Sequence, residues 1–167
     1  MKIKIADANI ILIVKILSSK FGENEQIPVK YTCDGENINP PLEFQDIPEG
    51  TASLVLIVDD PDAPSGDWVH WLVWNIDPNI RKIPENWHEN QVVEGMTSFG
   101  KPGFGGPCPP ASPAKRGELS GIHRYFFKLY ALDKIADLPA TVVKHDLLKA
   151  VENHVIAQAQ LIGLYSR

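Results

Sequence analysis

The chain has 167 residues, of which 44% are hydrophobic and 22% are charged, and its formal net charge is −5. This length fits a single domain over residues 1–167 with a substantial core, and the composition excludes disordered and fibrous classes. The acidic balance argues against a broad surface for nucleic acid or anionic lipid, because such surfaces are basic. A negatively charged ligand would have to be held by a small site with local hydrogen-bond donors.

The first twenty residues contain a short apolar run that is typical of neither a leader nor a membrane span. Residues 10–14 fall short of the roughly 7–15 residues of a signal-peptide core, and no small-residue cleavage site follows them. No stretch approaches the roughly 18 apolar residues of a transmembrane helix. Residues 2–5 alternate between lysine and isoleucine, as in an edge strand. We expect a cytoplasmic protein without an integral membrane segment.

The two cysteines, Cys33 and Cys108, do not form a C-x-x-C pair, which argues against zinc-ribbon and thioredoxin-type sites. Their spacing is compatible with free buried thiols or with one disulfide. Free thiols are the expectation for a cytoplasmic protein, because intracellular disulfides are uncommon outside hyperthermophiles.

Three apolar segments predict β-strands at the centre of the domain. Residues 53–59 and 69–76 are apolar on both alternations, which is typical of strands covered on both faces. Residues 123–132 alternate instead, so that His123 faces inward with the apolar side chains while Arg124 faces outward. Fourteen prolines and twelve glycines also favour strands joined by shaped loops over a helical bundle.

Residues 95–101 match the P-loop pattern up to its last position, where Pro102 replaces the serine or threonine that would bind magnesium. The glycine-rich residues that follow cannot begin the helix that a P-loop requires. The sequence also lacks a G-x-S-x-G nucleophile elbow and an H-E-x-x-H zinc motif. We therefore expect no enzymatic activity, no cofactor and no bound metal.

The C-terminal region is predicted to be helical. Apolar residues from Leu147 to Ile162 recur at helical spacing, Asp146 suits the first turn, and Gly163 is expected to end the helix. Strands followed by a helix indicate a mainly β, or α+β, architecture.

Polar residues from three segments together predict a small anion pocket. Asp60 and Asp62 lie in a turn stiffened by prolines, and His70 begins the next strand. Residues 103–106 offer glycine N–H groups that can cradle an anion, and His123 lies further along the chain. In this hypothesis the histidines donate hydrogen bonds to phosphate-like oxygens, while the aspartates accept from the remaining imidazole N–H groups. A solvated turn, a core histidine and a flexible loop are the ordinary alternatives.

These segments, with several others, resemble the phosphatidylethanolamine-binding protein family, in its bacterial and archaeal Raf-kinase-inhibitor-like branch. The resemblance extends over nearly the whole chain from about Phe21. Its motifs are YTCDGEN at 31–37, NPPL at 39–42, DDPDAP at 59–64, WVHWLV at 68–73, GFGGPCPP at 103–110, HRY at 123–125 and AQAQLIG at 157–163. Several long motifs in one order are far more specific than any single short pattern.

The resemblance implies a large antiparallel β-sheet packed on a smaller sheet, with a C-terminal helix near the pocket. It also implies an anion site for phosphate, acetate or a phosphoethanolamine head group. Members of the family are described as ligand binders and as inhibitors of kinases or serine proteases, with no general enzymatic activity. Carried across residue by residue, the pocket consists of Asp60, Asp62, Ala63, His70, Gly106, Pro107, His123 and Tyr125.

Two segments depart from the family pattern. Residues 111–122 look like a loop insertion that would alter the pocket rim or a partner surface. Residues 1–20 extend beyond the common start, either as an added edge strand or because the start is assigned too early, with Val14 as the alternative initiator.

The leading hypothesis is therefore a non-enzymatic, regulatory protein that binds a small anionic or phosphate-bearing ligand, without nucleic acid. A first alternative, supported by residues 111–122 and the proline-rich loop, is a protein inhibitor of a serine protease or kinase. A second is a metal-dependent hydrolase with Asp60, Asp62, His70 and His123 as ligands. A homodimer is expected from family analogy and from the general frequency of twofold dimers.

Overall fold

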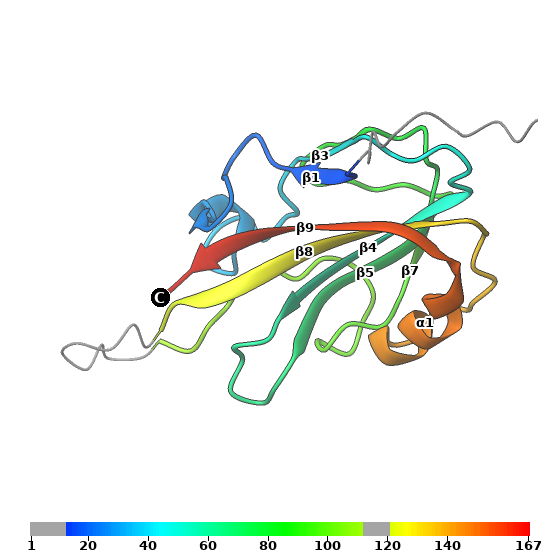
Figure 1. The fold of residues 1–167 in the computed structure, drawn as a ribbon. Coiled ribbons are helices and arrows are strands. Elements are labelled where there is room, and N and C mark those ends of the chain that lie inside the picture. The colour runs from blue at the N-terminus through cyan, green and yellow to red at the C-terminus, as the bar shows by residue number, and fades with distance from the viewer. Residues whose placement is uncertain (1–12, 112–120) are drawn as a thin grey trace, which may run out of the picture.

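A computed structural model describes residues 13–111 and 121–167, and in these residues a small sheet, a large sheet and a short helix form successive layers (Figure 1). The predicted fold class is confirmed. The alternating residues 2–5 and most of the 111–122 insertion lie outside the described residues. Within the described residues, no helix has the length and apolar character needed to cross a membrane.

The larger sheet has six strands in the order β2-β9-β8-β4-β5-β7, all antiparallel except the β2–β9 pair. Its strands are β2 (Glu25–Gln26), β4 (Ser53–Asp60), β5 (Trp68–Ile76), β7 (Val93–Glu94), β8 (His123–Leu132) and β9 (Val155–Tyr165). The smaller sheet has the order β1-β3-β6, with strands Lys15–Leu17, Leu42–Gln45 and Lys82–Ile83. The helices are 3₁₀ turns at Val29–Tyr31 and Glu152–His154 and the α-helix α1 at Lys144–Val151.

The three predicted central strands are confirmed as β4, β5 and β8. Every residue of β4 is buried because the strand lies between two apolar clusters. One cluster fills the space between the sheets and includes Trp71 and Phe127, while the other lies under α1 and includes Trp74 and Leu147. The alternating inward and outward positions predicted for residues 123–132 also match the observed burial of β8.

The predicted C-terminal helix is wrong beyond α1. From Val155 the chain forms the strand β9, which pairs with β8 along almost its whole length, from Leu132↔Val155 to His123↔Tyr165. Residues 155–161 also satisfy a two-residue period, with the small or apolar odd positions on one face and Ile156 and two glutamines exposed on the other. The helical and strand patterns coincide here, and the long pairing with β8 decides between them. Gly163 therefore ends no helix; it lies inside β9.

The described part of the N-terminal segment contains a strand. Residues 15–17 form β1, which pairs with β3 and makes an edge of the smaller sheet. Ile16 is buried in the core between the sheets, so the described end of the extension is part of the packed fold.

The expectation of free thiols is wrong, because Cys33 and Cys108 form a disulfide with a Cα–Cα distance of 5.4 Å. Backbone contacts align the two segments that it joins. The Cys33 N–H donates to the Pro107 carbonyl at 3.1 Å, and the Gly106 N–H donates to the Asn37 side-chain oxygen at 2.7 Å. The bond therefore fixes the glycine- and proline-rich loop to the 3₁₀ turn, a long-range pairing that no local sequence pattern predicts.

Replacement of both cysteines by serine is expected to lower the free energy of unfolding by about 4 kcal/mol, because the bond closes a loop with a sequence separation of 75. Urea unfolding with and without a dithiol reductant measures this loss. The reductant should destabilise the wild type and leave the double variant unchanged, and equal stability of the two oxidised proteins would contradict the expectation.

Candidate functional site

A cavity of about 410 Å³ lies where β4 ends and β5 begins, at the end of the sheet where β8 starts. Figure 1 shows that the C-terminus lies at the same end. The lining residues are Asp60, Ala63, Pro64, Ser65, Trp68, His70, Phe99, Cys108, Pro109, Pro110 and His123. Four predicted site residues, Asp60, Ala63, His70 and His123, therefore line one cavity, although 63 positions separate Asp60 from His123 in the sequence.

His70 reaches this cavity because of a β-bulge in β5. Val58 pairs with Trp71, but the next residue, Asp59, pairs with Val69, so His70 is an extra residue without a partner in β4. A bulge re-aims the extra side chain, which here lies on the same side as Trp71, toward the core between the sheets. Strict alternation would have directed the ring to the opposite face, under α1.

The His70 ring is held by one hydrogen bond and two aromatic contacts. Its Nδ1 lies 2.7 Å from the Gly105 carbonyl oxygen, which can only accept, so Nδ1 carries the hydrogen. The ring packs edge-to-face against Phe99 and Tyr125, and only 3% of the residue is exposed. This burial lowers the pKa of His70 below its ordinary value of 6.5, against the opposing effects of the Gly105 hydrogen bond and the Asp60 charge. The ring is therefore held neutral at physiological pH.

His123 is oriented by a carboxylate, as the pocket hypothesis predicted for one of its aspartates. Its Nδ1 donates to Asp60 Oδ2 at 2.7 Å, and both side chains are almost completely buried. Asp60 Oδ1 accepts the Asp62 N–H at 2.8 Å, so the turn that follows β4 fixes the carboxylate in turn. The His123 ring stacks on Tyr125.

Tyr125 forms the floor beneath both imidazoles. It is fully buried, its ring contacts His70 and His123, and burial raises the pKa of its hydroxyl. Within the described part of the chain, this hydroxyl has no hydrogen-bond partner. Tyr125 therefore packs against both imidazole rings and is not one of the residues that line the cavity.

Asp62 does not orient an imidazole, contrary to the sequence hypothesis. Its carboxylate binds Arg124 of β8 through the guanidinium Nε and Nη2, each at 2.9 Å, and through the Arg124 backbone N–H at 3.0 Å. The side-chain hydrogen bonds from Arg124 lower the pKa of Asp62. Asp62 thus ties the acidic turn to the outward face of β8, where alternation had placed Arg124.

Two of the three glycines of the predicted anion nest, Gly105 and Gly106, have N–H groups that are bonded within the protein. The Gly105 N–H donates to the His70 carbonyl at 2.9 Å, and the Gly106 N–H donates to Asn37. A Cβ at Gly106 would lie 2.5 Å from the Tyr31 carbonyl oxygen, so glycine is required there for close packing. Gly106 and Pro107 therefore lie behind the cavity wall, and the loop offers His70 a carbonyl oxygen in place of amides for a ligand.

The sequence hypothesis missed the apolar part of the cavity. Trp68 and Phe99 lie edge-to-face with ring centroids 5.5 Å apart, and three prolines and the disulfide complete the wall. Phe99 had appeared only inside the false P-loop match. The Trp-Val-His-Trp and Gly-Pro-Cys-Pro-Pro motifs were signals for part of this surface, whereas nothing in the sequence pointed to Phe99.

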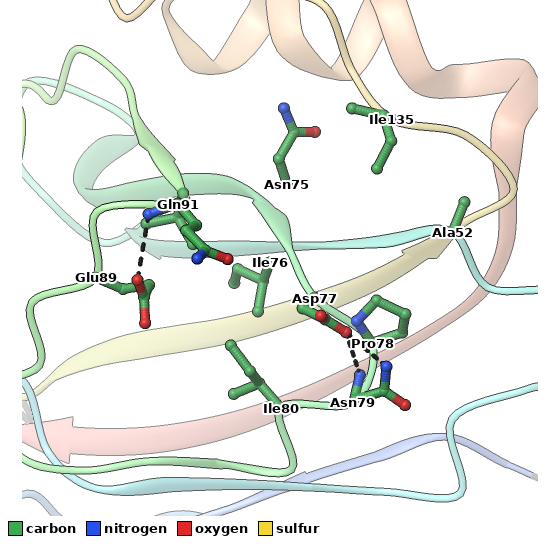
Figure 2. Close-up of a pocket in the computed structure, with 11 residues that line it drawn as sticks. Ala52, Asn75, Ile76, Asp77, Pro78, Asn79, Ile80, Glu89, Gln91 and Ile135 are labelled. Carbon is green, nitrogen blue, oxygen red and sulfur yellow. Dashed lines mark hydrogen bonds between the residues drawn. The ribbon is translucent and has the colours of Figure 1, made fainter.

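A second hollow of about 410 Å³ lies at the opposite end of β4 and β5, near Asn75 and Ile76 (Figure 2). Its polar groups are bonded to their own neighbours: Asp77 accepts from Asn79, and Glu89 accepts from the Gln91 N–H. Figure 2 shows that these pairs lie on separate sides of the hollow. The convergent imidazoles therefore distinguish the first cavity as the candidate site.

The sequence matches the family described as "Phosphatidylethanolamine-binding protein" over residues 17–166. The chain belongs to this family. It is 47% identical over 152 residues to a UPF0098 protein of Methanothermobacter thermautotrophicus, covering 88% of this chain and 95% of that protein. A UPF0098 protein of Pyrococcus horikoshii is 46% identical over 158 residues, which cover 90% of this chain and 76% of the relative.

Two crystal structures of family members share the fold. A protein of Chlamydia trachomatis described as a phosphatidylethanolamine-binding protein homologue superposes with a TM-score of 0.85 and 38% identity, over 93% of this chain and 99% of that chain. YbcL of E. coli, described as a new member of the mammalian family, gives a TM-score of 0.81 and 28% identity, over 92% and 98%.

The buried, neutral His70 should make the protein less stable as the pH falls. The folded pKa lies below 6.5, so the unfolded state binds the proton more readily, and the free energy of unfolding should decrease from pH 6.5 downward. The lowered pKa of Asp62 changes the free energy of unfolding only near and below pH 3.8, which is outside this range. In His70→Asn, whose amide can replace the Nδ1–H donor, the decrease between pH 6.5 and about 5 should be shallower. Urea unfolding at several pH values measures the slopes, and identical slopes would contradict this account.

If Asp62 acts only through Arg124, then Asp62→Asn, Arg124→Met and the double variant should behave alike. If phosphoethanolamine binds in this cavity, each variant should weaken its binding at most about fivefold, because a surface ion pair contributes little. Calorimetric titration of all four proteins completes the cycle. A loss in Asp62→Asn that greatly exceeds the loss in Arg124→Met would instead place the carboxylate on the ligand.

Proposed function

We propose that this protein binds a small anionic or phosphate-bearing head group in the cavity between β4, β5 and β8, in a regulatory and non-enzymatic role. One observation carries the proposal: His70 and His123 line one cavity, and each ring is fixed through Nδ1, which leaves its Nε2 for a ligand. Membership of the phosphatidylethanolamine-binding protein family supports a ligand of this chemistry.

The two alternatives have less support. Asp62, one of the four ligands that a metal-dependent hydrolase would use, is bound to Arg124. The inhibitor hypothesis depends on residues 111–122, most of which lie outside the described residues. We therefore rank both below ligand binding.

The cytoplasmic location and the homodimer remain predictions. The disulfide bears on the first of them, because thiols in the cytoplasm of mesophiles are kept reduced, whereas intracellular proteins of hyperthermophiles retain disulfides. A cytoplasmic location therefore accords with this bond most readily in a hyperthermophilic source.

Addition of phosphoethanolamine or inorganic phosphate should shift the imidazole NMR signals of His70 and His123. The exposed His88, which does not line the cavity, serves as the control and should not respond. His123→Asn keeps an N–H donor for Asp60 and removes Nε2 together with the rest of the ring, so it should weaken binding about tenfold or more, whereas His88→Gln should bind as the wild type does. Unmoved His70 and His123 signals at saturating ligand would refute the proposed function.

A further inference from the structure

The hydrogen bonds of the two histidines decide what the cavity offers to a ligand. The partner of each Nδ1 is an acceptor, the Gly105 carbonyl oxygen for His70 and the Asp60 carboxylate for His123, each at 2.7 Å. Both Nδ1 atoms therefore carry hydrogen, and in a neutral ring the other nitrogen, Nε2, then has a lone pair and no hydrogen. With both rings neutral, each imidazole can only accept a hydrogen bond through its Nε2.

The charged groups around the cavity do not offset this pattern. Of the lining residues that the structure describes, none is lysine or arginine, and the Asp60 carboxylate adds negative charge. The Arg124 guanidinium is bound to Asp62 on the outward face of β8. A phosphate dianion entering the neutral cavity would therefore meet the imidazole lone pairs and a carboxylate, which repel it, with the Ser65 hydroxyl and the Trp68 indole N–H as neutral side-chain donors in the lining.

The rings have few other titratable neighbours. His70 is faced by Asp60 and Asp59 of β4 and by Tyr125 of β8. His123 is faced by Asp60, by Asp62 of the acidic turn, by Arg124 and Tyr125 of its own strand, and by its partner on β9, Tyr165. The charges of Asp60 and Asp59 act to raise the pKa of His70, against the larger effect of burial, and Asp60 is in direct contact with His123.

We propose that this cavity binds a phosphate monoester together with one proton taken from solvent, so that the bound state has one proton more than the free protein and the free dianion. The inference rests on the proposed function and specifies its ligand chemistry. The proton forms an N–H bond at Nε2 of His123, and this N–H then donates to a phosphate oxygen; no covalent bond to the ligand forms or breaks. The Asp60 carboxylate, already bonded to Nδ1, stabilises the imidazolium.

His123 is the ring assigned to this proton because it contacts the carboxylate directly. His70 faces a neutral carbonyl oxygen in the same position, and burial lowers its pKa. The cavity would thus use one ring as a donor to phosphate and the other as an acceptor, for example from a ligand hydroxyl or ammonium group. A phosphate ester that also bears a donor group satisfies both rings.

Calorimetric titration with phosphoethanolamine tests the inference. At about pH 7.5 the phosphate is mostly a dianion, since its second pKa is near 6. The binding enthalpy is measured in several buffers of different ionisation enthalpy, whose slope gives the number of protons taken up. We expect about one proton per site, and an affinity that weakens up to about tenfold per pH unit as the pH rises above neutrality.

Three outcomes separate this inference from the proposed function. Binding with no proton uptake and with constant affinity across this pH range would overturn the inference and leave the proposed function standing. Absence of both binding heat and NMR shifts would overturn both. His123→Asn should retain weak binding but lose the proton uptake, whereas His88→Gln should keep it; uptake that persists undiminished in His123→Asn would overturn the assignment to this ring.

Discussion

The candidate site depends on the unequal number of residues in β4 and β5. One extra residue in β5, opposite the Val58–Asp59 step, directs the His70 ring toward the same core as Tyr125 and Trp71. A regular ladder would leave this ring on the face covered by α1, and the cavity would contain one imidazole. The bulge also leaves the His70 carbonyl free to accept the Gly105 N–H, so the same irregularity anchors the glycine loop.

That anchoring explains why the loop shapes the cavity without supplying donors to it. The N–H groups of Gly105 and Gly106 donate to the His70 carbonyl and to Asn37, and the disulfide with the contacts of Cys33 holds the loop against the 3₁₀ turn. The loop is therefore a rigid wall that presents a carbonyl oxygen to His70. The polar side chains of the lining are those of the two histidines, Asp60 and Ser65, beside the aromatic surface of Trp68 and Phe99.

Sequence patterns predicted the position of a site residue correctly where that position depends on the alternation of a single strand. The alternation in residues 123–132 placed His123 inward and Arg124 outward, and both positions are correct. Residues 69–76 are apolar on both alternations, so no pattern could place His70, whose position depends on how β5 pairs with β4. Residues 155–165 fit both a helical and a strand period, and only pairing with β8 selects the strand. The disulfide and the contact of Phe99 are likewise long-range.

The two imidazoles act as acceptors toward the cavity because of the hydrogen-bond partners of their Nδ1 atoms, and not because of their residue type. Two histidines beside an acidic turn suggest donors for an anion when only the sequence is considered, because an imidazole can donate from either nitrogen. The structure occupies the donating nitrogen of each ring with a protein acceptor, so the cavity-facing nitrogens need a proton from elsewhere. The Asp60 carboxylate accepts from Nδ1 of His123 and so stabilises a charged ring there, whereas the Nδ1 of His70 meets a neutral carbonyl oxygen and burial lowers the pKa of that ring. His70 and His123 thus acquire opposite hydrogen-bonding roles, because the partner of Nδ1 is a carbonyl oxygen in one and a carboxylate in the other.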